Sequence, residues 1–576
     1  MSTNEPLDCV VIGYNEVPFG EYERLLGQYG ADSEAYRDLQ YSFVEVAGRK
    51  LDYMGLLNHV YGLAGVGAPE FKSCDIPNLA AVYLDHFLRR SGHRSTYVNL
   101  FQHERAELGR LLDRDPVCVA ITTTFYVMNN PVTEMVRFIR ERNPRTKIVV
   151  GGPLVANHAR NYQGHDDEDK HDHTRPISLR GPKSPEPAAE RLDPEFAAAL
   201  EDIGADIYVH EAQGELTLAR VVERLKASGD LAGVPNLIYS EGGRFRVTAK
   251  MPESNSLDES FIDWRAYAGR GLGPTLQTRT ARSCAFNCSF CNYPTRAGKL
   301  TLAGLDTLEK ELDSMHSLGG VRNVVFIDDT FNVPLPRFKE ICRLMIRKRY
   351  GFDWFSYFRC SNSDEEAVEL LAESGCKGVF LGIESGSPAI LQNMNKAATI
   401  EKYARGMEML HDRGVITFAS LIFGFPGETE ETVAETVNFI RETRPTFYRG
   451  QLWYCETGTP IERQRERFGI SGEGFVWRHA TMDSLQAMDH LDRAFLTIKE
   501  STWLPQWSFD FWAIPYLLGL GVSAGQLKAL LADAHGLLRL EIAAVPPSRK
   551  SRLQQTHLDN MALAAAGRLG TAARGA

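Results

Sequence analysis

Two long stretches of the chain alternate short apolar runs with amphipathic helical segments. The first stretch holds apolar, β-branched runs that predict buried strands at 8–14, 95–101, 117–125, 147–153 and 205–212. Amphipathic segments predict helices between them at about 77–90, 131–142 and 214–228. Strands that alternate with helices form a parallel sheet covered on both faces. This amino-terminal part is therefore predicted to be a Rossmann-like α/β domain, followed by a hairpin that turns at Gly242 and Gly243.

The second stretch begins near residue 300 and repeats the alternation. Apolar runs predict strands at 323–331, 352–360, 378–386, 416–428 and 448–454. Helical segments stand between them, including 305–319 and 400–413. The pattern amounts to about six βα units, which indicates a second parallel α/β domain.

Three further segments interrupt or follow these stretches. Residues 21–74 contain helix-like pieces and recurrent aromatic residues, and we expect a packed helical lid. Residues 157–190 are polar and hold His158, His165, His171 and His173, which suits a solvated insertion better than a metal site. The predicted domains are therefore 1–250, 262–461 and a mostly helical 462–576.

The carboxyl-terminal part contains residues that suit either a substrate pocket or the core. Its aromatic residues are Trp503, Trp507, Trp512 and Tyr516, for which core packing is at least as good an explanation. For His479 we favour a packed histidine over a substrate contact.

Composition and charge narrow the class of protein. Of the 576 residues 43% are hydrophobic and 24% charged, and no apolar run reaches the ~18 residues needed to span a bilayer. The first residues lack a basic region followed by an apolar stretch, so we expect a cytoplasmic protein. A net charge of -10 argues against nucleic acid as a partner.

Residues 277–298 contain the pattern with the clearest chemistry. Cys284, Cys288 and Cys291 form a C-x3-C-x2-C run, which places three thiolates in one short loop. A four-iron cluster normally takes four cysteine ligands, so three leave one iron open. The alternative is a structural zinc site, but zinc requires four ligands and the nearest candidates, His316 and Cys342, lie outside the loop.

This cysteine spacing resembles the cluster loop of the radical S-adenosylmethionine (radical SAM) enzymes, whose open iron chelates SAM. The resemblance implies a partial (β/α)6 barrel with a [4Fe-4S] cluster and extends to three later segments, FIDDTF, LGIESGS and IFGFPGET. It implies that Asp328 or Asp329 binds the SAM amino group, and that Glu384 and Ser385 contact its ribose or carboxylate. It also implies that the backbone at Gly424 and Gly427 runs past the adenine of SAM. Phe290 matches the apolar or aromatic residue that the family has before the last cysteine.

Three strand ends of the amino-terminal domain resemble the loops of B12-binding domains. The segments TTTF, GGP and HEAQGE combine threonine hydroxyls with glycines that let backbone approach a bulky ligand. The resemblance implies cobalamin contacts from Thr122, Thr123, Phe125, Gly151, Gly152, Pro153, Glu211, Gly214 and Glu215. The loop at 14–23 lacks the D-x-H-x-x-G histidine of many such proteins, so we expect no histidine from it beneath the cobalt. A vestigial domain that binds nothing is the alternative.

Together these patterns resemble the cobalamin-dependent radical SAM methyltransferases. The resemblance implies that SAM cleaved at the cluster activates a small-molecule substrate, which methylcobalamin then methylates. A flavodoxin- or ferredoxin-type donor is expected to supply the electron. The opening DCVVIGYNEVPFGEYERLL is similar to the phosphinate P-methyltransferase-like branch of natural-product pathways such as antibiotic biosynthesis.

Other classes of protein fit part of these patterns. Cyclisation, ring rearrangement or redox chemistry without methyl transfer fits the same two-domain plan. A B12-sensing protein would need no cluster, and a zinc protein would be colourless.

Overall fold

The computed structural model divides the chain into two compact units. Unit 1 consists of Met1–Val17 and Pro77–Asp263, and unit 2 consists of Pro18–Ile76 and Trp264–Ala576. The structure describes residues 6–67, 70–72, 76–124, 126, 128–162, 192–211, 213–505, 507, 509, 511–543 and 545–567. The predicted solvated insertion therefore lies mostly outside the described residues, as do Phe125 and three of its histidines, His165, His171 and His173.

Unit 1 is built on a sheet whose strand order is β4-β1-β5-β6-β7-β8-β9. The first five strands are parallel, and β8 and β9 add an antiparallel hairpin to β7. The strands are β1 Cys9–Tyr14, β4 Ser95–Leu100, β5 Cys118–Thr122, β6 Lys147–Gly151, β7 Ile207–Val209, β8 Leu237–Glu241 and β9 Arg244–Val247. The Rossmann-like prediction is confirmed, with strands shorter than the apolar runs that predicted them.

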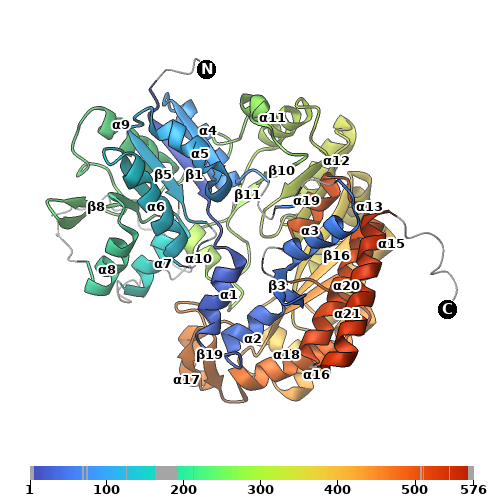
Figure 1. Ribbon diagram of the computed structural model, residues 1–576. Helices are drawn as coiled ribbons and strands as arrows, with labels where there is room; N and C mark the ends of the chain where they lie inside the picture. The colour runs from blue at the N-terminus through green and yellow to red at the C-terminus, as the bar shows by residue number, and fades with distance from the viewer. Residues whose placement is uncertain are drawn as a thin grey trace. The chain divides into compact units, whose positions relative to one another are not determined.

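Helices cover both faces of this sheet, as Figure 1 shows. On one face α4 and α9 contact each other, and α4 also packs on β1 and β4. On the other, α5, α6, α7 and α8 bury an apolar core against the sheet. The helices are α4 Leu79–Arg90, α5 Phe101–Leu112, α6 Asn130–Arg142, α7 Pro153–Tyr162, α8 Pro194–Ile203 and α9 Glu215–Lys226.

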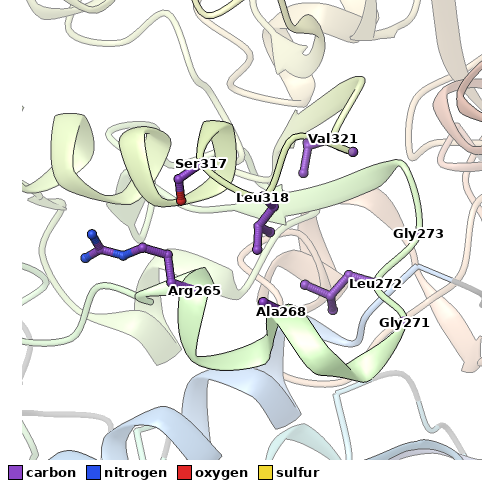
Figure 2. Close-up of a pocket in the computed structure, with 9 residues that line it drawn as sticks. Arg265, Ala268, Gly271, Leu272, Gly273, Ser317, Leu318 and Val321 are labelled. Carbon is purple, nitrogen blue, oxygen red and sulfur yellow. The ribbon is translucent and has the colours of Figure 1, made fainter.

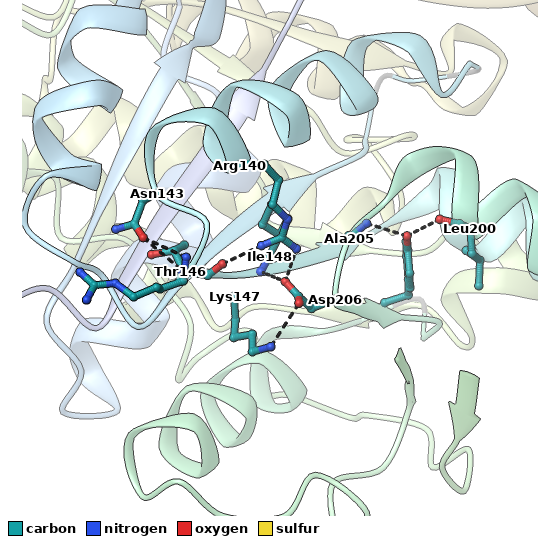
Figure 3. Close-up of polar contacts among 10 residues, drawn as sticks. Arg140, Asn143, Thr146, Lys147, Ile148, Leu200, Ala205 and Asp206 are labelled. Carbon is teal, nitrogen blue, oxygen red and sulfur yellow. Dashed lines mark hydrogen bonds and ion pairs between the residues drawn. The ribbon is translucent and has the colours of Figure 1, made fainter. Parts of the chain in front are cut away.

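A polar network joins α6, β6 and the segment before β7 (Figure 3). One Asp206 carboxylate oxygen accepts a hydrogen bond from the Ile148 N–H at 2.8 Å and from Arg140 at 2.5 Å. Lys147 contacts the other oxygen at 3.2 Å. These bonds fix the amino ends of β6 and β7, while the opposite strand ends carry the predicted cobalamin loops.

Unit 2 is built on a second parallel sheet with the strand order β10-β13-β14-β15-β16-β17-β21. The strands are β10 Thr275–Thr278, β13 Asn323–Phe326, β14 Asp353–Phe358, β15 Cys376–Glu384, β16 Ile416–Phe423, β17 Phe447–Leu452 and β21 Thr502–Trp503. The helices between them are α11 Leu305–His316, α12 Leu335–Lys348, α13 Glu365–Glu373, α14 Pro388–Asn393, α15 Ile400–Asp412 and α16 Glu430–Thr443. The predicted series of βα units is present, and β21 extends the sheet.

Residues 18–76 belong to unit 2, whereas the sequence placed them inside an amino-terminal domain 1–250. Arg37 pairs with Asp492 at 2.7 Å and with Asp489 at 2.8 Å, and Tyr41 donates a hydrogen bond to Asp492. In Figure 1 the blue α3 lies beside the red α21, and these helices are in contact. The segment comprises α1 Phe19–Gly27, α2 Glu34–Gln40, β2 Phe43–Val46, β3 Arg49–Asp52 and α3 Tyr53–Leu63.

The carboxyl-terminal part is mostly helical but also contains a small antiparallel sheet. Trp503 is 1% exposed and packs on Tyr41, Tyr448 and Phe495, so it belongs to the core. The elements are α17 Arg465–Phe468, β18 Ser471–Glu473, β19 Val476–His479, β20 Met482–Asp483, α18 Ser484–Thr497, α19 Ala513–Gly519, α20 Ala524–Ile542 and α21 Pro547–Ala565.

Helix α19 packs against the amino ends of β10 and β13, the strand ends opposite the cysteine loop. The Asn323 side chain donates a hydrogen bond of 2.6 Å to the Pro515 carbonyl. Across the described residues, no helix combines the length and apolar character that a membrane crossing requires.

Candidate cofactor sites

The cysteine loop is attached to the carboxyl end of β10. Strands β11 Ala281–Arg282 and β12 Thr301–Leu302 pair in antiparallel fashion and close the loop at its base. Asp328, which follows β13, accepts hydrogen bonds from the backbone N–H groups of Thr280 at 2.7 Å and Ala281 at 2.9 Å. Its second oxygen accepts from the Thr280 hydroxyl at 2.6 Å. The three cysteines therefore lie where parallel α/β sheets place their ligands.

The three predicted cluster ligands are all free thiols. The Cys291 N–H donates to the Cys288 carbonyl at 3.1 Å, which turns the backbone between them. Burial raises the pKa of Cys291 to about 11, and repulsion from Cys288, Asp329 and Cys284 adds to this. The cysteine thiols thus lie within electrostatic reach of one another.

This donor set fits a cluster held by three cysteines, although the sulfurs do not converge as they stand. Within the described ranges, no group of three or more His, Cys, Asp or Glu side chains is arranged to hold a metal ion. A zinc site with a fourth protein ligand is therefore not preformed there either. The chemistry of three free thiols on one loop is the observation that supports the cluster.

The two aspartates after β13 differ in availability. Asp328 is 4% exposed and its oxygens accept the three hydrogen bonds described above. Asp329 retains solvent access, although surrounding protein desolvates its carboxyl and, with the Asp328 charge, raises its pKa to about 6. Of the pair, Asp329 is the better candidate for an ammonium group.

The segment after β15 supplies an ion pair beside the cysteine loop. Glu384, at a φ of +65°, binds the Lys396 ammonium at 2.9 Å. That ammonium also lies 5.3 Å from the ring centre of Phe290. Ser385 is fully buried, and its hydroxyl lies 3.1 Å from that of Thr436 on α16. Glu384 thus lies near the loop, whereas Ser385 is engaged in packing.

The loop after β16 is shaped by Gly424. Its φ is +83°, and an added Cβ would lie 2.4 Å from the Trp477 ring. Glu428 accepts a hydrogen bond from the Gly424 N–H, and the His479 ring nitrogen lies 3.2 Å from the Gly424 carbonyl. His479 is 5% exposed and stacks on Trp477, which supports a packed histidine. Gly424 is therefore buried against Trp477, and the adenine contact expected for it stays a prediction.

The predicted cobalamin loops meet at the carboxyl ends of β1, β5 and β6. The Thr122 hydroxyl donates to the Gly13 carbonyl at 2.8 Å, and the Thr123 hydroxyl to the Gly151 carbonyl at 2.9 Å. Gly152 has a φ of +116°, and a Cβ there would lie 2.8 Å from the Thr123 hydroxyl oxygen. Pro153 begins α7 directly after this turn. Gly152 thus lies close against Thr123, and the cobalamin contacts expected of these loops stay a prediction.

The end of β7 carries buried polar atoms that lack a hydrogen-bond partner in the described structure. They are His210 Nε2 and Gln213 Oε1. Burial lowers the pKa of His210 to about 4, so its ring is neutral. Glu211 and Glu215 are also buried, and a Cβ on Gly214 would lie 3.2 Å from Val209. Unsatisfied polar atoms beside glycine-shaped backbone fit a polar ligand such as the nucleotide tail of cobalamin.

The histidine-free loop after β1 is held by Asn15, which sequence reasoning missed. Its amide nitrogen donates to the Pro131 carbonyl and to Glu134, both at 2.9 Å. Its N–H donates to the Tyr126 hydroxyl at 2.5 Å, and the Tyr126 ring stacks on Tyr14. Its position directly after a buried strand is the feature of the sequence that could have indicated this role.

A pocket with a volume of about 440 Å³ lies at the other end of the barrel strands (Figure 2). It is formed by the 3₁₀ helix Trp264–Arg270, the segment before β10 and the turn after α11. Because the cysteine loop follows the carboxyl end of β10, this pocket is distinct from the cluster region.

Two family profiles match the chain. The radical SAM superfamily matches residues 278–440, and the B12 binding domain matches residues 73–172. An uncharacterized methyltransferase of Pyrococcus horikoshii is 29% identical over 241 residues, which are 41% of this chain and 52% of that protein. The anaerobic magnesium-protoporphyrin IX monomethyl ester cyclase of Rubrivivax gelatinosus is 26% identical over 298 residues, 49% of this chain and 52% of that protein. The matches thus span about half the length of these relatives.

A solved structure agrees in fold. The radical SAM methyltransferase TsrM of Kitasatospora setae, determined with cobalamin and a [4Fe-4S] cluster bound, has a TM-score of 0.52 at 20% identity. The superposition covers 69% of this chain and 74% of TsrM. The chain therefore carries a radical SAM domain at 278–440 and a B12-binding domain at 73–172, which imply a [4Fe-4S] cluster with SAM and cobalamin as cofactors.

Proposed function

We propose that this protein is a cobalamin-dependent radical SAM methyltransferase. Its substrate is a small-molecule natural-product intermediate, methylated on an unactivated carbon or a phosphinate phosphorus. The observation that carries the proposal is the loop with three free cysteines at the carboxyl end of β10, in a chain that also has glycine-shaped loops at the strand ends of unit 1. The matching relative from Pyrococcus horikoshii supports methyl transfer as the reaction.

The residues of unit 2 bind the cluster and SAM. When bound, the cluster with SAM supplies a radical and cobalamin supplies a methyl group. Cys284, Cys288 and Cys291 hold the cluster, and Asp329 accepts hydrogen bonds from the SAM amino group. The adenine is proposed to lie along the loop that contains Gly424, whose own backbone is packed against Trp477.

The residues of unit 1 bind the second cofactor. The turn at Gly151 and Gly152 admits its bulk, and Thr122 and Thr123 fix that turn through their hydroxyl bonds to backbone carbonyls. Glu211, Gly214 and Glu215 border the same strand ends. No histidine of the loop at 14–23 is available to coordinate cobalt from below.

A second function deserves testing because one matching relative is a cyclase. In that case the same cofactors serve a cyclisation, ring rearrangement or redox step, and no methyl group is transferred. Product mass separates the two functions, since methyl transfer adds one CH₂ to the substrate.

The decisive experiment is anaerobic reconstitution with iron and sulfide, followed by a SAM-cleavage assay on wild type and Cys288→Ala. We expect brown wild-type protein that releases 5′-deoxyadenosine, and colourless Cys288→Ala that does not. Cys342→Ala is the matched control, because Cys342 is a buried cysteine of α12 outside the loop. Retained 5′-deoxyadenosine formation in Cys288→Ala would refute the assignment.

An external electron donor of the flavodoxin or ferredoxin type completes the proposal. Radical SAM cleavage consumes one electron, and a small reductase partner is the source we propose for it. Activity with a reduced flavodoxin in place of dithionite tests this partner directly.

A further inference from the structure

Arg359 is a buried cation directly beside the cysteine loop. It follows the carboxyl end of β14 and is 7% exposed. Its guanidinium carbon lies 3.7 Å from the ring centre of Phe286, which stands between Cys284 and Cys288. At this distance the guanidinium plane and the aromatic ring form a close cation–π contact.

The backbone of Arg359 is fixed by a fully buried asparagine. The Arg359 N–H donates to the Asn332 side-chain oxygen at 2.9 Å, and the Asn332 amide donates to the Arg359 carbonyl at 3.0 Å. These two hydrogen bonds hold the Arg359 backbone at the end of β14. From there the side chain reaches Phe286 in the cysteine loop.

The guanidinium lacks an anionic partner within the described part of the chain. Its Nη2 atom is buried without a hydrogen bond, and no carboxylate there forms an ion pair with it. Lys396, a second cation near the loop, is paired with Glu384 at 2.9 Å. Arg359 thus leaves one positive charge uncompensated beside the loop.

Burying an unpaired charge is strongly unfavourable, so such a charge is normally matched by an anion. Here the anion must come from a bound group. The charge lies beside the thiols of the loop, because Phe286 stands between Cys284 and Cys288. A cluster with three thiolate ligands, and the carboxylate of SAM bound to it, are both anionic.

We propose that Arg359 is a positioning residue that supplies the buried counter-charge for the anionic group bound at the cysteine loop. Stacking on Phe286 fixes the guanidinium, and Nη2 donates a hydrogen bond to that group. The group is either a sulfur of the cluster or the carboxylate of SAM. This inference rests on the proposed function, because it requires that the loop holds the cluster.

The test compares Arg359→Gln, Arg359→Lys and wild type in three measurements that do not depend on turnover. They are iron and sulfide content after reconstitution, the midpoint potential of the cluster without SAM, and the dissociation constant of SAM. If the partner is the cluster, Arg359→Gln shifts the midpoint potential to a more negative value, since removing a positive charge disfavours the reduced form. If the partner is the SAM carboxylate, the potential is unchanged and SAM binding weakens at least tenfold.

In either case Arg359→Lys, which keeps the charge but loses the planar fork, is expected to lie between wild type and Arg359→Gln. Thermal unfolding of the cofactor-free proteins excludes a merely structural role. Without its anion the buried charge is unfavourable, so Arg359→Gln is expected to unfold at the wild-type temperature or above. A lower unfolding temperature with unchanged potential and SAM affinity would overturn the inference.

Failure of this inference is distinguishable from failure of the proposed function. Wild-type protein that takes up no iron refutes the proposed function. Wild-type and Arg359→Gln proteins with equal iron content, equal potential and equal SAM affinity refute only the role of Arg359.

Discussion

At the scale of single residues, the loop after β16 requires glycine at position 424, because a Cβ there would collide with its neighbours. Gly424 combines a positive φ with a backbone that lies against Trp477 and Ala487. Its N–H and carbonyl are both engaged, by Glu428 and His479. A residue with a side chain would therefore have to displace an indole ring and break the loop's hydrogen bonds.

Gly424→Ala is predicted to destabilise the protein by about 1–3 kcal/mol, because it adds both backbone strain and overpacking. Denaturant unfolding measures the change. Gly525→Ala is the matched control, since Gly525 lies in α20 with nothing within 4 Å of its added Cβ. Equal stability of the two variants would contradict the role assigned to Gly424.

Glu428 gives the protein a pH-dependent stability of known sign. Burial raises its pKa to about 8 from the ordinary 4.5, and the Gly424 and Phe425 backbone N–H groups only partly oppose this. Between these two values the folded protein keeps the Glu428 proton, whereas the unfolded chain releases it. The free energy of unfolding is therefore highest, as far as Glu428 is concerned, below about pH 4.5 and falls as pH rises towards 8.

Glu428→Gln is predicted to flatten the decline in unfolding free energy between about pH 5 and 8, because glutamine stays neutral. Chemical denaturation at a series of pH values measures the slope in both proteins. An unchanged slope in the variant would show that Glu428 is not the titrating group.

At the scale of elements, the helix α2 is attached to α18 by charge. The Arg37 side chain is 17% exposed and reaches Asp489 and Asp492, and Tyr41 also bonds Asp492. These contacts attach the segment 18–76 to residues far along the chain. The aromatic stack of Tyr22 on Trp507, 4.2 Å between ring centres, adds a second attachment.

Arg37→Ala is predicted to lower the free energy of unfolding by about 1–2 kcal/mol, since the charge-assisted hydrogen bonds of a largely buried guanidinium are lost, above all the one to Asp492. Arg405→Ala serves as control, because its ion pair with Glu365 is largely exposed and such pairs contribute little. Urea unfolding compares the two, and an equal loss in both variants would contradict the prediction.

At the scale of the whole molecule, the residues proposed for the two cofactors fall in different units. The cluster ligands belong to unit 2 and the glycine-shaped cobalamin loops to unit 1. Each set is placed by the strand ends of its own sheet. A mutation that prevents binding of one cofactor is therefore not expected to prevent binding of the other.

Cys288→Ala is predicted to lose its iron while keeping wild-type affinity for cobalamin, and Gly152→Val to lose cobalamin while keeping iron. Valine at position 152 would meet the Thr123 hydroxyl in a backbone conformation that β-branched residues avoid. Iron analysis and optical titration with cobalamin measure both. Joint loss of the two cofactors in either variant would contradict independent binding.

Much of this architecture was predictable from the sequence because its strands are buried on both faces and read as continuous apolar runs. The strands β1, β4, β5 and β6 lie within the predicted runs. The short strands β10 and β21 were missed, since four and two residues leave little pattern to detect. The antiparallel strands β18–β20 were hidden for the same reason.

The candidate sites were predictable in part. Cysteine spacing is local, so the sequence shows it directly. Contacts such as Arg359 on Phe286, or Asn15 with Glu134, join residues that are far apart along the chain and have no local signature. Asp328 is also bonded to the backbone of Thr280 and Ala281, which follow the neighbouring strand β10. This contact leaves Asp329 as the carboxylate available to a ligand, and the local sequence does not show it. The predicted domain limits at 250, 262 and 461 stay a prediction, apart from the assignment of 18–76 to unit 2.

The attachment of α2 to α18 also has a consequence for biosynthesis. Arg37 and Asp492 are separated by 455 positions, so the ribosome needs roughly 20–90 s to deliver the partner at 5–20 residues per second. During that interval the nascent chain carries an apolar segment whose docking surface has not yet been made. Chaperones that bind exposed apolar segments of nascent chains should therefore raise the yield of correctly assembled protein.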